Sequence, residues 1–393
     1  MKKSNIFFVL LAVFFLSNLN AEFVTSEKFN YSLDLPEMFY IEDFSKDETS
    51  ILFKNQKLSV ELACRVWNKK DYSSSKKCLS ETLKKIYAEG EISSFEWNTR
   101  ACSISEFEIN EKVFGQKMKG WAICSPLSKS ENFLTLLCYT SEKTYFDSMQ
   151  FILSVLDSLI LDKRDFKTPG IITTFAFPRN SPQKINLNIQ NKIIPCEIDS
   201  IDEEAATFVI DREFAVFSLY TSEKCWKEAW QRFYRLIERD TIERVKKCSL
   251  EIFKYLTPVA ISSGEENPDF AIAQILLNWV QNFDYQRKSA SASKADFQNI
   301  PSVLKGIPSD CDSRSLLLFA LFKTMNIESV MLISVDYSHA MIAVNFEGKQ
   351  GQTYSYNNKE YLFGETTAKN LTFGKIDSAM QDRKKWIPVE FYE

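Results

Sequence analysis

The sequence predicts a multidomain α+β protein. Its 393 residues exceed the usual size of one domain, which favours two or three domains. Hydrophobic residues make up 45% of the chain, and it has only 10 Gly and 11 Pro, so we expect hydrophobic cores rather than disorder. Strand-like runs and helical periodicity are mixed along the chain without an internal repeat, which indicates units that contain both helices and strands.

The first 21 residues have the features of a secretory signal peptide. Lys2 and Lys3 precede an unbroken apolar run, Ile6–Leu16, and the polar stretch that follows ends on Ala21. We therefore expect an exported protein in the periplasm or cell envelope of a bacterium, with no transmembrane span after the signal is removed. The alternative is retention as an N-terminal membrane anchor, because Leu19 is larger than a cleavage site prefers.

Residues 22–165 are predicted to form one α+β domain. The spacing of apolar residues predicts a helix over Tyr72–Tyr87 and a closing amphipathic helix over Phe146–Leu161. The expected strands are Phe29–Leu35, two within Ser50–Ala63, then Ser93–Asn98, Ala101–Ile109, Val113–Cys124 and Phe133–Thr140. A first strand that runs into Pro36, a meander and a closing helix with the sequence SVLDSL resemble the PsbP/Mog1-like α/β/α sandwich. The resemblance implies a binding or structural role for this domain.

A charged segment, Lys163–Pro169, is predicted to link this domain to a connecting domain over residues 170–260. The connecting domain is expected to be β-rich at first and then to form a long helix over Lys224–Leu256. Its expected strands are Ile171–Phe177, Ile185–Ile189, Ala206–Ile210 and Phe214–Tyr220. Residues 261–393 form the predicted C-terminal α+β domain, in which Phe270–Phe283 has helical periodicity.

The nine cysteines agree with export. Eight lie in the first two domains: Cys64, Cys78, Cys102, Cys124, Cys138, Cys196, Cys225 and Cys248. In an oxidising compartment they allow four disulfides, whose connectivity the sequence leaves open. The alternative is that several are buried small hydrophobic side chains. The ninth, Cys311, stands apart, and an odd cysteine in a secreted protein is a candidate reactive thiol.

Charge and motif content argue against several functions. The net charge is −4, with no basic cluster, which disfavours nucleic acid and anionic membrane surfaces as partners. His339 is the single histidine, so a multi-histidine metal centre is excluded. Glycine-rich phosphate loops, a G-x-S-x-G elbow, an H-E-x-x-H motif and an EF-hand loop are absent, so we expect no cofactor and no metal.

Cys311 lies where a helix is expected to begin. Ser309 or Asp310 supplies a capping residue before it, and the strongly apolar run Leu316–Phe322 follows. The free N–H groups and the dipole of a helix N-terminus favour a thiolate, which is the nucleophilic form of cysteine. Because Asp310 and Asp312 oppose this negative charge, a base partner is still required.

His339 is the one imidazole that such a site can use. It begins the strand-like segment His339–Val344, and a helix and the strand Val330–Val335 separate it from Cys311. This spacing allows the helix to pack on a sheet whose next strand begins at His339. Glu365 follows an apolar strand and is a candidate to orient the imidazole. Taken alone, a single histidine is more often structural, and a glutamate in a solvated loop needs no catalytic role.

The sequences GIPSDCDSRSLLLFALFKTMNIESVMLISV, YSHAMIAVN and YLFGETT resemble the transglutaminase-like domain of the papain-like cysteine peptidase superfamily, over about residues 265–370. The resemblance implies Cys311 as nucleophile, His339 as base and Glu365 as the third member. By analogy with the glutamine of papain-like enzymes, it also implies Gln281 as an oxyanion donor. The sequence departs from the family at Ser309, where glycine is commoner, and at Glu365, where aspartate is commoner.

Such a site implies thiol-based acyl transfer, in which a thioester formed on the cysteine passes to water or to an amine. The expected function is therefore an exported cysteine peptidase or amidase that hydrolyses amide bonds in envelope proteins or peptidoglycan peptides. Transfer to an amine instead of water stays open. The alternative is a catalytically inert transglutaminase-like scaffold that acts as an envelope binding or assembly protein.

Overall fold

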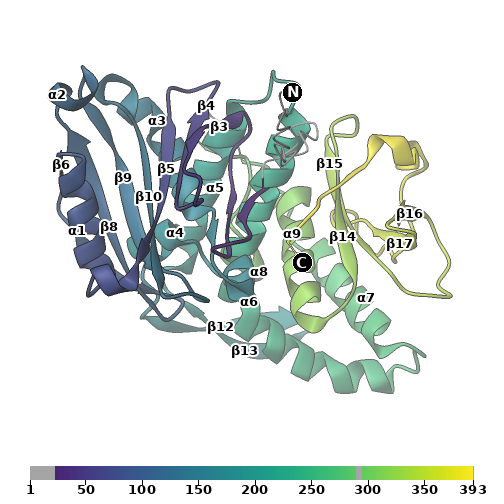
Figure 1. Cartoon of the computed structure of the whole chain (residues 1–393). Coiled ribbons are helices and arrows are strands. Elements are labelled where there is room, and N and C mark those ends of the chain that lie inside the picture. The colour runs from purple at the N-terminus through teal and green to yellow at the C-terminus, as the bar shows by residue number, and fades with distance from the viewer. Residues whose placement is uncertain (1–22, 289–293, 393) are drawn as a thin grey trace, which may run out of the picture.

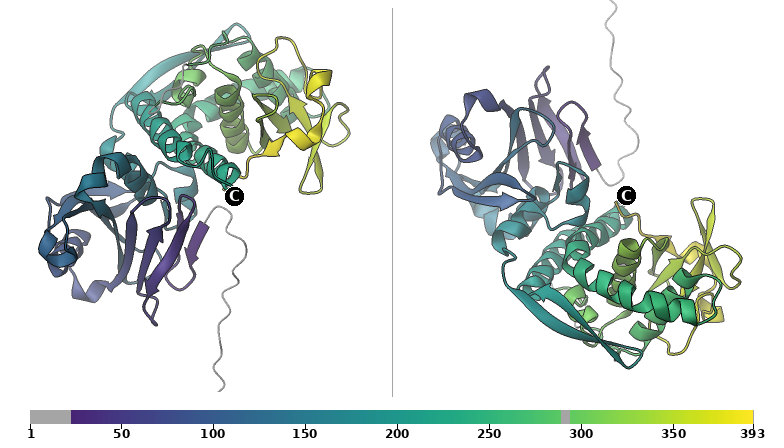
Figure 2. Two further views of the ribbon diagram at one scale, coloured as in Figure 1. Left: turned by 90° about the horizontal axis from the view of Figure 1, so that it is seen from above. Right: turned by 90° about the horizontal axis from the view of Figure 1, so that it is seen from below.

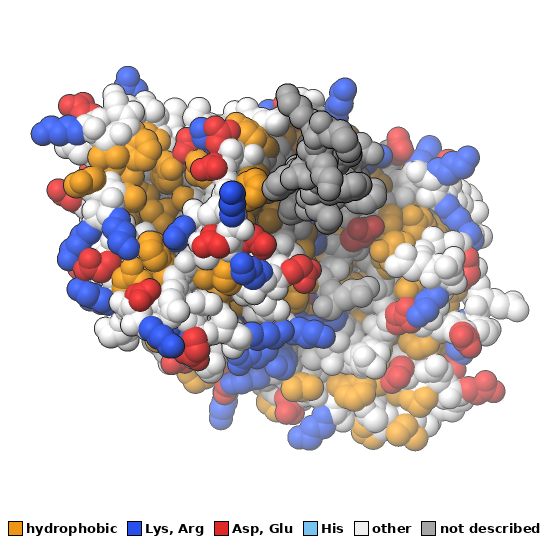
Figure 3. Space-filling view, in the orientation of Figure 1, with side chains coloured by type: hydrophobic (Ala, Val, Ile, Leu, Met, Phe, Trp, Pro, Cys, Tyr) orange, Lys and Arg blue, Asp and Glu red, His pale blue; other side chains and the backbone are white. Residues whose placement is uncertain are grey.

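The computed structural model describes residues 23–288 and 294–392, so the predicted signal peptide at residues 1–21 lies outside the described residues. Two units, each with its own sheet, lie on either side of the long helix α6 (Trp226–Ser262), as Figures 1 and 2 show. Over the described ranges, no helix combines the length and the apolar character needed to cross a membrane. On the face in Figure 3, acidic side chains lie beside basic ones over both units, so this surface carries charges of both signs.

The N-terminal unit is built on an antiparallel sheet with the strand order β3-β4-β5-β10-β9-β8-β6, and β7 pairs with β8. Its strands are β3 (Phe39–Phe44), β4 (Ser50–Asn55), β5 (Glu61–Asn68), β6 (Ala88–Glu89), β7 (Ser93–Trp97), β8 (Arg100–Ile109), β9 (Met118–Pro126) and β10 (Asn132–Ser141). A smaller sheet contains β1 (Phe23–Ser26), β2 (Tyr31–Asp34) and β11 (Leu159–Ile160). The helices are α1 (Ser75–Lys85), α2 (Glu111–Phe114) and α3 (Tyr145–Asp157).

Helices α1 and α3 cover opposite faces of the larger sheet. On β9, Ala122 and Cys124 belong to the core that contains α1, whereas Ile123 between them belongs to the core that contains α3. This arrangement follows from the alternation of side chains along a strand. The layers are therefore helix, sheet and helix, as the sequence predicted for residues 22–165. One element differs, because α2 forms where the strand at 113–124 was expected to begin.

Residues 170–260 contain much less strand than predicted. Helix α4 (Ile171–Ala176) replaces the strand expected at 171–177, and α5 (Asp202–Ser218) replaces those expected at 206–210 and 214–220. The buried apolar residues of α5 recur at helical spacing, at Ala205, Ala206, Val209, Ile210 and Val216. Periodicity alone does not separate a short buried strand from a buried helix, so the β-rich prediction was wrong. The hairpin of β12 (Pro182–Ile189) and β13 (Lys192–Asp199) contains the strand expected at 185–189.

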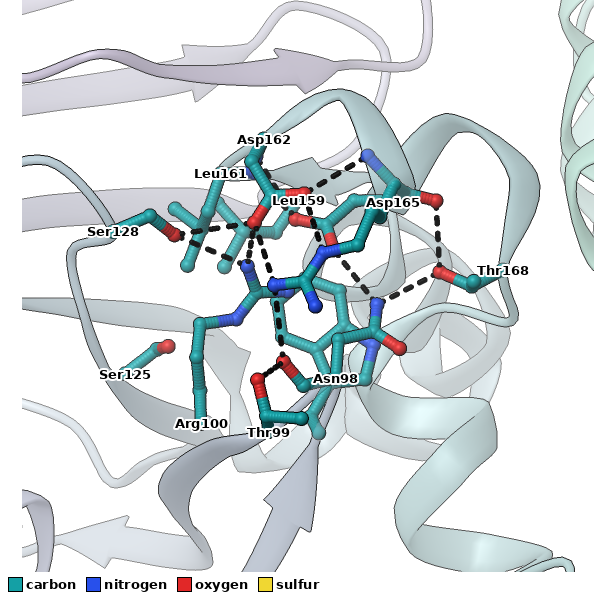
Figure 4. A network of polar contacts seen from close by, with 12 residues as sticks. Asn98, Thr99, Arg100, Ser125, Ser128, Leu159, Leu161, Asp162, Asp165 and Thr168 are labelled. Carbon is teal, nitrogen blue, oxygen red and sulfur yellow. Dashed lines mark hydrogen bonds and ion pairs between the residues drawn. The ribbon is translucent and has the colours of Figure 1, made fainter.

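The predicted linker at 163–169 is an ordered and partly buried segment. The fully buried carboxylate of Asp165 pairs with Arg100 of β8, and Asp162 accepts a second hydrogen bond from the same guanidinium at 2.8 Å (Figure 4). Asn98 donates to Asp165 and to Thr168 at 2.7 Å each. Because buried ion pairs and hydrogen bonds fix this segment, it does not behave as a free boundary between domains.

Arginine side chains of helix α6, largely buried, form hydrogen bonds with the N-terminal unit and with α5. Arg232 donates to Glu213 of α5 at 2.9 Å and to the backbone carbonyl oxygen of Asp34 at 2.8 Å. Arg235 makes two hydrogen bonds to the carboxylate of Asp34, at 2.9 and 3.0 Å. Two parallel bonds between guanidinium and carboxylate fix orientation as well as distance. Side chains of α6 therefore set the position of β2 relative to the C-terminal half.

Replacing Arg239 of α6 by alanine is expected to lower the free energy of unfolding by about 3 kcal/mol or more. Its guanidinium donates to the backbone carbonyl oxygens of Asp157, Leu159 and Asp165, at 2.8, 2.9 and 2.6 Å, and the substitution leaves these buried acceptors without that donor. Urea unfolding measures the change. In the control Arg164→Ala, the lost side chain is 60% exposed, and we expect a change below about 1 kcal/mol. Equal losses in the two variants would contradict this account.

The C-terminal unit contains an antiparallel sheet with the strand order β16-β17-β15-β14-β18. Its strands are β14 (Ser329–Ser334), β15 (His339–Val344), β16 (Thr353–Tyr356), β17 (Lys359–Gly364) and β18 (Ile387–Pro388), and its helices are α7 (Pro268–Gln281), α8 (Ile300–Leu304) and α9 (Cys311–Met325). On β15, Ala340 and Ile342 face the core that contains α9, whereas Met341 faces a second core with Trp386. Helix α9 thus packs on one face of the sheet, beside β14 and β15 (Figure 1).

Candidate active site

Cys311 is the first residue of α9, which is the position that the sequence predicted. Asp310 caps the helix, because its carboxylate accepts the N–H of Ser313 at 3.0 Å. The Cys311 side chain is buried, and its sulfur accepts a hydrogen bond from the backbone N–H of Ala340 on β15. Ala340 directly follows His339, so the fold brings the thiol close to the first residues of β15.

His339 and Glu365 form a hydrogen-bonded pair. The Nε2 atom of His339 lies 2.7 Å from Oε2 of Glu365, which directly follows β17. Strands β15 and β17 are paired neighbours, with Ile342 opposite Gly364, and this pairing carries the two residues together. The other carboxylate oxygen of Glu365 accepts the N–H and the hydroxyl of Thr367, at 2.7 and 2.6 Å. Both oxygens of Glu365 are therefore fixed in place.

The surroundings of Glu365 favour its charged form. Burial raises the pKa of this carboxyl, but hydrogen bonds from His339 and Thr367 outweigh burial and bring the pKa below its ordinary value. The pair also borders a hollow of about 430 Å³, whose lining residues are His339, Glu365, Thr367, Ala368, Leu371, Lys375, Ile376, Asp377 and Met380. A charged carboxylate beside an imidazole is the arrangement that selects one tautomer and holds one ring orientation.

The Cys311 thiol is directed toward Asp312 in this structure. Its sulfur donates to Oδ2 of Asp312 at 3.4 Å, and the hydroxyl of Tyr234 on α6 donates to Oδ1 of the same carboxylate. Burial, followed by the charges of Asp312 and Asp310, raises the pKa of the Cys311 thiol. Within 23–288 and 294–392, no hydrogen bond joins this thiol to His339. In this conformation the thiol is engaged by Asp312.

Replacing Asp312 by asparagine is expected to increase the rate of Cys311 alkylation by iodoacetamide at neutral pH by about tenfold. The substitution removes a negative charge that raises the thiol pKa, so more of the thiol ionises and the pH profile of alkylation moves to lower pH. Mass spectrometry of the Cys311 peptide measures the rate. The control Asp269→Asn changes an exposed carboxylate on α7 and should leave the rate unchanged. An unchanged or slower rate for Asp312→Asn counts against this electrostatic role.

Gln281 has a role that differs from the expected one. It ends α7 with its side chain buried, and its amide nitrogen donates to the backbone carbonyl oxygens of Glu365 and Leu371, at 2.8 and 3.0 Å. Both amide hydrogens are thus engaged, and none is left for an oxyanion. The structure therefore corrects the oxyanion prediction, because Gln281 holds the loop that carries Glu365. The sequence prediction matched the residue type, but the backbone carbonyl groups that Gln281 contacts could not be predicted from the sequence.

Arg314 is a second positioning residue, and sequence reasoning missed it. The buried guanidinium donates to the backbone carbonyl oxygens of Phe283, Asp284 and Thr366, at 2.9, 2.8 and 3.1 Å. It also donates to the hydroxyl of Ser309 at 3.2 Å. Ser309, which departs from the commoner glycine, therefore helps to hold the guanidinium of Arg314. An arginine shortly before the apolar run Leu316–Phe322 is the sequence signal that could have indicated this role.

The cysteines are free thiols in the structure, including the eight that the sequence allowed to form four disulfides. Every one of the nine except Cys225 is buried.

Comparisons with known proteins give weak likenesses of fold. PsbP of the cyanobacterium Synechocystis sp. PCC 6803 matches with a TM-score of 0.31 and 11% identity, over 37% of this chain and 95% of that protein. The Ran-binding protein Mog1p of Saccharomyces cerevisiae matches with a TM-score of 0.28 and 9% identity, over 36% of this chain and 96% of that protein. A protein of Bacteroides thetaiotaomicron VPI-5482 matches with a TM-score of 0.23 and 11% identity, over 76% of this chain and 95% of its own.

No family model matches the chain. No curated protein matches it either. The N-terminal part of the chain is weakly similar to PsbP and Mog1, as the sequence predicted. Any assignment of the C-terminal unit to a family depends on the residues of that unit alone.

Proposed function

We propose that this chain is an exported, thiol-dependent acyl-transfer enzyme with a transglutaminase-like C-terminal domain. Cys311 is its nucleophile, His339 its base and Glu365 the acid that orients the imidazole. The proposed reaction is hydrolysis of amide bonds in envelope proteins or peptidoglycan peptides.

One observation carries this proposal, the 2.7 Å contact between Nε2 of His339 and Oε2 of Glu365. A carboxylate that accepts the Nε2 proton leaves Nδ1 unprotonated, and an unprotonated ring nitrogen is what a general base requires. The sulfur of Cys311 supports the proposal, because the N–H of the residue after His339 donates to it. The proposed order of nucleophile, base and acid is the one that acyl transfer by a thiol requires.

The proposed reaction begins when the thiol turns from Asp312 to Nδ1 of His339. The imidazole takes the thiol proton, and the sulfur attacks the carbonyl carbon of an amide. The tetrahedral intermediate collapses as the imidazolium returns the proton to the departing amine, which leaves a thioester on Cys311. Water then attacks the thioester with His339 as base and releases the acid and the free thiol. In this proposal free backbone N–H groups at the start of α9 stabilise the oxyanion, since the amide of Gln281 is engaged elsewhere.

A second candidate function is a transglutaminase-like scaffold without catalysis, which binds or assembles envelope partners. The contact between the Cys311 thiol and Asp312 favours it, because both the hydrogen bond and the charge stabilise the unreactive protonated form. In this case the pair of His339 and Glu365 serves packing and hydrogen bonding alone.

Assays of Cys311→Ala separate the two functions. The proposed enzyme releases new amino termini from casein or from peptidoglycan peptides, and Cys311→Ala is expected to lose this activity completely. The matched control is Cys225→Ala, because Cys225 is only partly buried and its location at the start of α6 separates it from α9. A wild-type protein without activity in this assay would overturn the enzyme proposal in favour of the scaffold. Activity that survives in Cys311→Ala, or that is lost equally in Cys225→Ala, would remove Cys311 as the nucleophile.

A further inference from the structure

Three of the hydrophobic cores divide the eight cysteines outside the candidate site into separate groups. Cys196 and Cys248 lie in the core that α6 shares with β13, and Cys78 and Cys124 lie in the core between α1 and the sheet. The core under α3 contains Cys64, Cys102 and Cys138, with Cys225 packed at its margin. A disulfide needs Cα atoms within about 7 Å and Cβ atoms that point toward each other, so pairing is confined to cysteines of one core.

Cys196 of β13 and Cys248 of α6 are in contact through their thiols. The two side chains are hydrogen-bonded to each other. The sulfur of Cys248 also lies 3.5 Å from the backbone carbonyl oxygen of Glu197, the residue that follows Cys196. These contacts place the two sulfurs side by side where the hairpin β12–β13 packs on α6.

Cys78 of α1 and Cys124 of β9 form a second thiol pair. Both side chains are fully buried in the same core, and a side-chain hydrogen bond joins them. The nearby Cys102 is not a partner for Cys124, although β8 and β9 are neighbours. Its sulfur contacts the hydroxyl of Ser125 at 3.3 Å and belongs to the core on the opposite face of the sheet.

We propose that two disulfides form in the exported chain, one between Cys196 and Cys248 and one between Cys78 and Cys124, while the other five cysteines remain thiols. The proposal draws on the proposed export for its oxidant and is independent of the proposed catalysis. Each disulfide joins elements that are distant in the sequence: the first ties the hairpin β12–β13 to α6, and the second ties α1 to the sheet.

The oxidation needs a co-reactant, which is a small-molecule or protein disulfide of the oxidising compartment. One protein thiolate attacks this disulfide, which forms a mixed disulfide and releases one reduced thiol. The second protein thiolate attacks the mixed disulfide, forms the internal S–S bond and releases the second reduced thiol. The two protein thiols thus lose two protons and two electrons, and the oxidant gains them.

Folding the purified chain in a buffer of glutathione and glutathione disulfide tests the proposal. The folded protein is denatured in N-ethylmaleimide and digested without reduction, and mass spectrometry identifies linked and labelled peptides. We expect linked peptides for Cys196 with Cys248 and for Cys78 with Cys124, and label on the other five cysteines. Label on both members of either proposed pair, or a link to any other cysteine, would overturn the proposal.

Single substitutions make this test independent of overall folding yield. In Cys248→Ser, Cys196 should become labelled while the link between Cys78 and Cys124 persists. The matched control Cys225→Ser should retain both links. Because Cys311 belongs to neither pair, a loss of hydrolysis in Cys311→Ala bears on the proposed catalysis and leaves the disulfide proposal untouched.

Discussion

Replacing Glu365 by glutamine is expected to reduce the turnover of the proposed hydrolysis by about 10³- to 10⁴-fold while the protein stays folded. The N–H and the hydroxyl of Thr367 both donate to Oε1, so the amide oxygen of the glutamine must stay at that position. The amide nitrogen then faces Nε2 of His339 and donates to it. The imidazole becomes a tautomer with its proton on Nδ1, which cannot accept the thiol proton.

The change is measured as kcat for release of amino termini, together with the melting temperature. The matched control is Glu360→Gln, since Glu360 lies on the same strand, β17, with its side chain 55% exposed. This control should retain full activity. A Glu365→Gln enzyme with nearly the activity of the wild type would remove Glu365 from the mechanism.

Replacing His339 by alanine is expected to lower kcat by about 10³-fold or more, because the chain has no other imidazole to act as the base. The protein should still fold, since the His339 side chain lies at the margin of the core and is 11% exposed. The measurement is the same assay of released amino termini. The control Asp336→Ala alters an exposed residue of the turn that precedes β15. If both variants lose activity equally, disruption of this turn explains the loss and His339 has no special role.

Much of the N-terminal unit could be predicted, because its strands are short apolar runs that turn residues separate. The strands expected at 101–109 and 133–140 correspond closely to β8 and β10, and the helix expected at 72–87 contains α1. Helix α5 was missed for a physical reason. It is buried between α3, α6 and α8, and its short apolar runs at 206–210 and 214–220 cannot be told from buried strands by periodicity alone.

The candidate site was predictable where the residue types are chemically distinctive. A single histidine, an odd cysteine at a helix start and the resemblance of the flanking sequences pointed to Cys311, His339 and Glu365, and the fold brings the last two into contact. The partners that come from distant elements could not be predicted. Tyr234 contacts Asp312 only because α6 packs on α9, and the bonding of Gln281 depends on a loop that follows β17.

Covalent labelling of Cys311 by a peptide with an electrophilic ketone group tests the central claim most directly. The ketone occupies the place of the amide carbonyl, so its rate of reaction reports on both the thiol and its base. We predict that the wild-type protein is labelled at Cys311 alone, at a rate about 100-fold or more above that of His339→Ala. Equal rates for the two proteins, or label on a different cysteine, would contradict a catalytic pair of Cys311 and His339.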